Sequence, residues 1–216
     1  MKYIYIIFVV LITNPFLIAS KKTDTTKTWK FIYQSSITAT DNFKIPTIKV
    51  KSTCFTDQKI IHVESKIIND DVAFTSFDTE SELVLIDINT KIAYTLNQDL
   101  TVKSIEKILT ELIEPESIIE SKNTKLNLST STFNIKSSEA TVTTCKTLGN
   151  YITIGVFIKN TDGGLVGFTK SNSKNTSKTL LTNIEEAKFS FSKYYEIIKS
   201  NQPIDKNSLK SFSFFK

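Results

Sequence analysis

A period of two in the apolar residues runs through most of this chain and constrains its fold more than any other feature. Trp29, Phe31 and Tyr33 occupy alternate positions of one segment, and Ile61 and Val63 do so in another. Successive side chains of a β-strand point to opposite faces of a sheet, so this spacing predicts strands with one apolar face. Frequent Phe, Tyr, Ile, Val and Thr suit such strands. We therefore expect about ten strands, separated by turns that contain Asn, Asp or Gly.

One segment departs from this period. Apolar residues of the stretch 101–114 recur at intervals of three and four, which predicts an amphipathic helix. Asp99 or Thr101 can cap its start, and Pro115 ends it. The only surface available to its apolar stripe is the sheet. The predicted fold class is α+β: a large curled antiparallel sheet of about ten strands, an open half-barrel, with one central amphipathic helix packed on it.

The beginning of the chain has the pattern of an export signal. Lys2 precedes the apolar run Tyr3–Ile12, and the small residues Ala19 and Ser20 follow. The run is shorter than the about 20 residues of a membrane span, although a retained signal anchor is the alternative. We expect a signal peptide over 1–20, a single β-rich domain over 21–198 and a polar tail over 199–216. The expected location is secreted or extracellular, and periplasmic if the host is bacterial.

Cys54 and Cys145 are the only cysteines of the chain. In an oxidising compartment such a pair predicts one disulfide, and two separate buried thiols are the alternative. A single histidine and two distant cysteines do not suit a zinc site, so no metal is expected. Asn127 and Asn175 each begin an Asn-x-Ser sequon, which makes them glycosylation candidates in a eukaryotic host.

Charge is distributed unevenly along the sequence. The chain has no arginine, and its 27 basic residues are all lysine. Lysine predominates over 21–56 and 121–216, whereas the segment 57–120 contains five lysines and fourteen acidic residues. The lack of arginine forks and the acidic middle disfavour nucleic-acid binding. Two interpretations of the lysine-rich segments are open. They form a polar surface that is simply solvated, or they form a basic surface that meets an anionic membrane or cell surface.

Catalytic patterns are scarce. His62 is the only imidazole, and the alternation places it with Glu64 and Lys66 on the polar side of its strand. No Gly-x-Ser-x-Gly elbow is present, and the acidic pairs Asp70-Asp71 and Glu80 with Glu82 fall in turns or on one strand face. We expect no catalytic residues and no cofactor; an exported hydrolase would need His62 or two carboxylates to converge in a cleft.

The order of the elements is similar to that of known carriers. Leu83–Leu96 predicts a strand, a turn and a strand, and Asn160–Phe168 a turn and a strand that lead on to Lys188–Phe191. Over about residues 28–198 this arrangement resembles the lipoprotein-carrier fold of bacterial outer-membrane lipoprotein carriers and mycobacterial lipid carriers, and is similar to the ependymin family. The resemblance implies an open half-barrel lined by apolar side chains, with helix over its mouth and a cavity for an acyl chain or another hydrophobic ligand.

The expected function is that of a secreted, non-enzymatic protein that holds a lipid or other hydrophobic ligand between sheet and helix. The alternative is a secreted structural or cell-surface interaction protein with a filled core and no ligand pocket. Each lining candidate can also be ordinary core, and a one-residue error in register would invert the faces. The candidates are Trp29, Phe31, Tyr33, Tyr94, Ile105, Leu109, Leu112, Tyr151 and Phe157.

Overall fold

The computed structural model describes residues 28–39, 47–57, 59–68, 81–108, 111–113, 115–135, 140–145, 156–158, 164–171 and 175–212. Fourteen strands and one helix are found in this part of the chain. In order they are β1 (Thr28–Ala39), β2 (Ile48–Thr56), β3 (Ile60–Ile67), β4 (Glu82–Asp87), β5 (Ile92–Leu96), β6 (Val102–Ile108), β7 (Glu111–Ile113), β8 (Pro115–Asn123), β9 (Leu128–Ile135), β10 (Ala140–Cys145), β11 (Val156–Ile158), β12 (Gly164–Ser171), β13 (Asn175–Ala187), α1 (Ser192–Ser200) and β14 (Ser211–Phe212).

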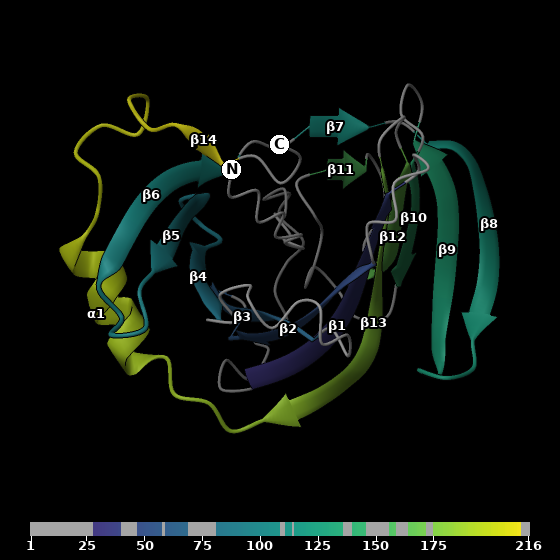
Figure 1. Cartoon of the computed structure of the whole chain (residues 1–216), viewed down its shortest axis with the longest axis horizontal. Helices are drawn as coiled ribbons and strands as arrows, with labels where there is room; N and C mark the ends of the chain where they lie inside the picture. The colour runs from purple at the N-terminus through teal and green to yellow at the C-terminus, as the bar shows by residue number, and fades with distance from the viewer. Residues whose placement is uncertain are drawn as a thin grey trace, which may run out of the picture.

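Twelve of these strands form one sheet, in the order β14-β6-β5-β4-β3-β2-β1-β13-β12-β10-β9-β8. Its strand pairs are antiparallel except for β14, which runs parallel to β6. β7 and β11 form a separate parallel pair. In Figure 1 the large sheet curves from β6 through β1 to β8, so one face is concave and the other convex. The prediction of a large curled antiparallel sheet with one helix is therefore confirmed.

The predicted position of the helix is wrong. Residues 102–108 form strand β6, and the helix lies at Ser192–Ser200 instead. The pairing of β6 with β5 explains the error, because Val102 lies opposite Leu96 and Ser104 lies opposite Thr95. Lys103 is thus an extra residue, a β-bulge, and it brings Val102 and Ile105 to the same face despite their spacing of three. The bulge accounts for the spacing of Val102 and Ile105. Ile105 and Ile108 are also three residues apart, but they lie in the regularly paired part of β6 and therefore on opposite faces.

Helix α1 packs on the convex face of the sheet, outside the curve (Figure 1). Its buried Tyr194 and Ile198 are four residues apart and therefore lie on one side of the helix. Together with Phe191 they join a core cluster from β3, β4 and β5, which we call the outer core. Its sheet residues are Ile60, Leu83, Leu85, Ile92, Tyr94 and Leu96.

The segment after α1 returns to the sheet. Leu209 packs against the outer core, and the backbone N–H of Lys107 in β6 donates to the carbonyl of Lys210 at 2.9 Å. Residues 211–212 then add β14 to the edge of β6. This part of the segment 199–216 therefore contributes to the domain rather than extending away from it.

Candidate binding faces of the sheet

The alternation of side chains assigns each strand residue to one of the two faces. Tyr94 belongs to the outer core, and its cross-strand partners Leu85 and Ile105 share its face. Phe31 lies opposite Cys54, which lies opposite Val63, which lies opposite Val84. Val84 alternates with Leu83 and Leu85 of the outer core, so this second series lies on the concave face, which we call the inner face.

The predicted lining residues do not share one face. Trp29, Phe31 and Tyr33 lie together on the inner face, as the sequence predicts. Tyr94 and Ile105 lie on the convex face, where they pack in or against the outer core beneath α1. The grouping of Tyr94 with Trp29, Phe31 and Tyr33 on an inner face is therefore wrong, because the alternation within β5 fixes which residues face α1.

The remaining lining candidates are only partly described. Leu109 and Tyr151 lie outside the described residues. The backbones of Leu112 and Phe157 lie opposite each other in the β7–β11 pair.

The inner face has an apolar row that crosses five neighbouring strands. Ile184 of β13, Phe31 of β1, Cys54 of β2, Val63 of β3 and Val84 of β4 are successive cross-strand partners. Four of them are buried, and Phe31 and Val84 are fully so. Ile184 is half-buried. We call this set the apolar row. It gives the concave face a continuous hydrophobic band perpendicular to the strands.

A polar row runs beside it and consists of the residues two positions away along each of the strands β1 to β4. Glu82 lies opposite Ser65, which lies opposite Ser52, which lies opposite Tyr33. The hydroxyls of Ser52 and Ser65 are 2.7 Å apart in a hydrogen bond, and the Tyr33 hydroxyl donates to the carbonyl of Leu165 at 3.1 Å. Burial raises the pKa of Tyr33 well above its usual value. These hydroxyls therefore stay neutral and mostly paired within the sheet.

Glu82 is the ionisable end of the polar row. The pKa of its carboxyl is raised from 4.5 to about 7, mainly by burial and to a smaller extent by Glu106, against the opposing effect of Lys103. Its Oε2 atom has no hydrogen-bond partner in the described part of the chain. The acid is therefore partly protonated near neutral pH, and it can donate a hydrogen bond when it is neutral.

The two cysteines do not form the predicted disulfide. Cys54 is in β2 and Cys145 in β10, and β1, β13 and β12 lie between these strands in the sheet. Both side chains are buried. Burial raises the pKa of the Cys54 thiol to about 12. The alternative of two separate buried thiols is the one that the structure supports, because their strands are not neighbours.

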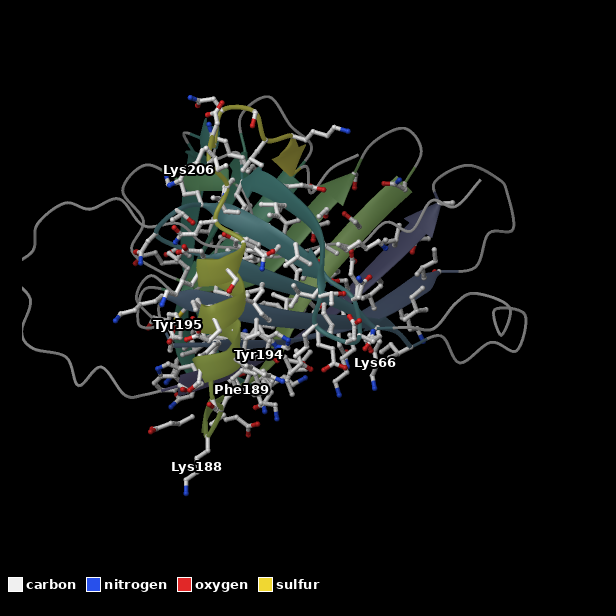
Figure 2. All side chains as sticks on the ribbon, turned by 90° about the vertical axis from the view of Figure 1, so that its left-hand side faces the viewer. Lys66, Lys188, Phe189, Tyr194, Tyr195 and Lys206 are labelled. Carbon is white, nitrogen blue, oxygen red and sulfur yellow. The ribbon has the colours of Figure 1, made fainter. Side chains whose placement is uncertain are left out.

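His62 is buried on the convex face rather than solvated with Glu64 and Lys66. Its ring lies against Phe55, Phe189 and Tyr194, with the centroid of Phe189 at 5.5 Å and that of Tyr194 at 4.6 Å. Figure 2 shows Tyr194 of α1 next to Phe189, which precedes the helix. Neither ring nitrogen has a hydrogen-bond partner among the described residues. The aromatic neighbours offer no acid that could orient the imidazole for base catalysis.

A hollow of about 300 Å³ lies where α1 meets the ends of β3 and β4. Beside it, the Tyr195 hydroxyl donates to Oδ2 of Asp57 at 2.5 Å, while Oδ1 of Asp57 accepts from the backbone N–H groups of Lys59 and Ile60. Burial and the Asp57 carboxylate raise the pKa of Tyr195. The hollow is lined by Lys59, Ile60, Asp87, Asn89, Tyr195, Glu196, Ile198, Lys199 and Gln202.

Lysines gather on the convex face away from α1. Lys51 of β2 lies directly opposite Lys66 of β3, and Lys49 lies opposite Ser36 of β1, which lies opposite Lys178 of β13. We call Lys49, Lys51, Lys66 and Lys178 the lysine face. Like charges directly opposite each other in a sheet are destabilising. A bound anion would relieve this repulsion.

The glycosylation candidates lie at the edges of elements. Asn127 is exposed in the turn between β8 and β9 and has a left-handed backbone with φ 51°. Asn175 is half-buried at the first position of β13.

Within the described ranges no group of three or more His, Cys, Asp or Glu side chains could hold a metal ion. No helix there is long and apolar enough to cross a membrane.

No protein family model matches the chain, and no curated protein matches it. Among solved structures, one of PNGF-II is similar, with 14% sequence identity and a TM-score of 0.35 over 76% of this chain. The matched region spans 29% of the PNGF-II chain, which is less than a third of its length.

Proposed function

We propose that this protein is an exported, non-enzymatic carrier that binds a lipid or another hydrophobic ligand on the inner face of its curled sheet. The observation that supports this best is the apolar row, which crosses five neighbouring strands of the concave face. Four of its residues are already shielded from water, so a ligand gains contact with them only by displacing the groups that shield them. From the sequence we expected the ligand to lie between sheet and helix. Because Phe191, Tyr194 and Ile198 pack directly onto the outer core, we place it on the opposite face.

The proposed mechanism is burial. An acyl chain transferred from water to an apolar surface gains about 0.8 kcal/mol for each buried methylene, and no covalent step is needed. The neighbouring polar row suits an amphipathic ligand, because Glu82 can donate a hydrogen bond to a head group when it is neutral and accept one when it is ionised.

Trp29 provides a direct test. It is the chain's only tryptophan and lies on the inner face, opposite Thr56 of β2. A brominated fatty acid bound on this face should quench its fluorescence, whereas the unbrominated acid should not. Native mass spectrometry of the same sample should show the bound acid as a non-covalent adduct.

The control moves the reporter to the other face. In a W29F/Y195W variant the single tryptophan occupies an exposed position of α1 on the convex side, so the same brominated acid should bind without quenching. Equal quenching in both proteins, or no adduct and no quenching in either, would overturn the proposal.

The lysine face favours a second candidate, an interaction protein that meets an anionic membrane or cell surface. Lys49, Lys66 and Lys178 are exposed there. Vesicles of phosphatidylserine and phosphatidylcholine should then sediment the protein, and vesicles of phosphatidylcholine alone should not. A K51E/K66E variant should lose this binding, and K206E, which changes an exposed lysine far along the chain, should largely retain it. Equal binding to both vesicle types would contradict this candidate.

A further inference from the structure

The two edges of the large sheet differ. At one edge β14 pairs with β6. At the other edge β8 pairs with β9, and no further strand follows it in the described part of the chain. In Figure 1, β8 is the outermost strand on its side of the molecule. Such an edge presents backbone N–H and C=O groups that can pair with another strand.

The outer half of β8 is accessible. Glu120, Ser121 and Lys122 are exposed, and Ile119 is 65% exposed, which is unusual for a large apolar side chain. A hollow of about 290 Å³ runs along this hairpin and is lined by Glu120, Ser121, Ser129, Thr130 and Ser131. The regular pairing with β9 covers Ile118–Asn123, because an irregularity separates Pro115 from Ile118.

The sequence of this edge is complementary to itself. Two antiparallel copies of β8 can pair about a two-fold axis through one residue, which then faces its own copy. Axes through Glu120 or Lys122 would place like charges opposite each other. An axis through Ser121 places Glu120 opposite Lys122 of the second copy, and Lys122 opposite Glu120 of the second copy. Opposite charges at directly opposed positions stabilise an antiparallel pair.

We propose that the β8 edge joins two copies of this chain by antiparallel β8–β8 pairing about Ser121. The strand that pairs with this edge is β8 of a second copy, because in that register Glu120 of each copy lies opposite the oppositely charged Lys122 of the other. The pairing covers residues 119–123 of each copy and brings Ile119 opposite Asn123 of the second copy. It makes one continuous sheet from the two curled sheets and leaves the inner faces free.

Two features of β8 could instead protect the edge from pairing. Proline, irregular pairing and lysine all discourage strand addition. Pro115 and the irregularity lie at the start of β8, outside residues 119–123. Lys122 discourages an arbitrary strand, but it faces a glutamate in the two-fold register. The edge is therefore selective for its own copy. A pairing of this size is small, so the dimer should form reversibly as concentration rises.

Charge reversal tests the register. The wild-type protein should show concentration-dependent dimerisation in sedimentation velocity. In a pair of E120K copies, lysine at position 120 lies opposite Lys122 of the second copy. In a pair of K122E copies, Glu120 lies opposite glutamate. Each variant alone should therefore remain monomeric at concentrations where the wild type dimerises. An equimolar mixture should dimerise again, because E120K then faces K122E with opposite charges at both positions.

The matched control is K125E, which makes the same charge change in the turn that follows β8, outside the paired residues. It should dimerise like the wild type, and circular dichroism should show the same sheet signal in all variants. A wild-type monomer throughout the concentration range would overturn the proposal. So would an E120K variant that still dimerises, or a mixture of E120K and K122E that stays monomeric.

Discussion

The imidazole ring of His62 in β3 lies 4.6 Å from the ring of Tyr194 in α1, measured between centroids and at an angle of 40°. Phe189 also lies against His62, and it stacks on Phe55 with the ring centroids 4.2 Å apart. The helix thereby covers a histidine that lacks hydrogen-bond partners within the described structure. This contact joins strand and helix, and it makes the stability of the helix packing sensitive to protonation.

Acid should destabilise the protein through His62. Burial, and secondarily Lys193, lower the pKa of His62 from 6.5 to about 4. A histidine with a lowered pKa in the folded state contributes stability that is present above pH 6.5 and is lost as the pH falls towards 4. This loss is on the order of 3 kcal/mol, because each pKa unit corresponds to about 1.4 kcal/mol.

The H62F variant should lose less stability than the wild type between pH 6.5 and 4 in urea unfolding. Phenylalanine keeps the aromatic packing but cannot bind the proton. Parallel stability curves for the two proteins over this range would contradict the assignment.

Glu82 should have the opposite pH dependence. Its pKa is raised from 4.5 to about 7, so it favours the folded state below pH 4.5 and this contribution is lost as the pH rises through 7. The E82Q variant should therefore be more stable than the wild type at pH 8, by about 1 to 2 kcal/mol after allowance for partial solvent screening. At pH 4 the difference should disappear. Thermal unfolding at both pH values measures this, and an E82Q protein that is less stable at pH 8 would refute it.

The bulge at Lys103 should make that position tolerant of deletion. Removal of Lys103 would leave Val102 and Ile105 two residues apart, which restores regular alternation with both side chains still facing the outer core. We expect a loss of no more than about 1 kcal/mol, because the deleted residue is exposed and the apolar face is kept.

The matched deletion is Glu64 in β3, which pairs regularly with β2 and β4 on either side. That deletion would move one part of β3 to the wrong face, and the protein should fail to fold. Similar stability of the two deletion variants, measured by urea unfolding, would argue against the strand assignment of β6.

Asp57 should matter more than its partner Tyr195. The Y195F variant removes one hydrogen bond at an exposed position, which should cost about 0.5 to 1 kcal/mol. The D57A variant also removes the acceptor for the N–H groups of Lys59 and Ile60 at the start of β3, so its loss should be larger. Urea unfolding of Y195F, D57A and the double variant measures both terms. Additive effects in the double variant would show that the two side chains do not interact.

Both thiols should be present in the purified protein. Because no disulfide joins Cys54 to Cys145, iodoacetamide should add two groups to the denatured chain without prior reduction. In the native protein the Cys54 thiol should react slowly, since burial excludes the reagent and raises its pKa to about 12. A denatured protein that accepts no groups until it is reduced would contradict this expectation.

The sequence alone determined where most strands lie and which of their residues share a face. Trp29, Phe31 and Tyr33 alternate regularly, and the structure places them on one face. Alternation is a local property of extended backbone, so it can be recognised without knowledge of the rest of the chain. The same local reasoning failed at β6, because the bulge at Lys103 exists only through the pairing with β5.

The tertiary structure alone decided which face meets the helix and what becomes buried. The spacing of Tyr194 and Ile198 is compatible with a helix, but only the packing of α1 shows that it covers Tyr94 and encloses His62. Strand order likewise separates Cys54 from Cys145 by three strands. Burial and pairing depend on residues that are distant in sequence, and alternation assigns two faces to a strand without specifying their partners.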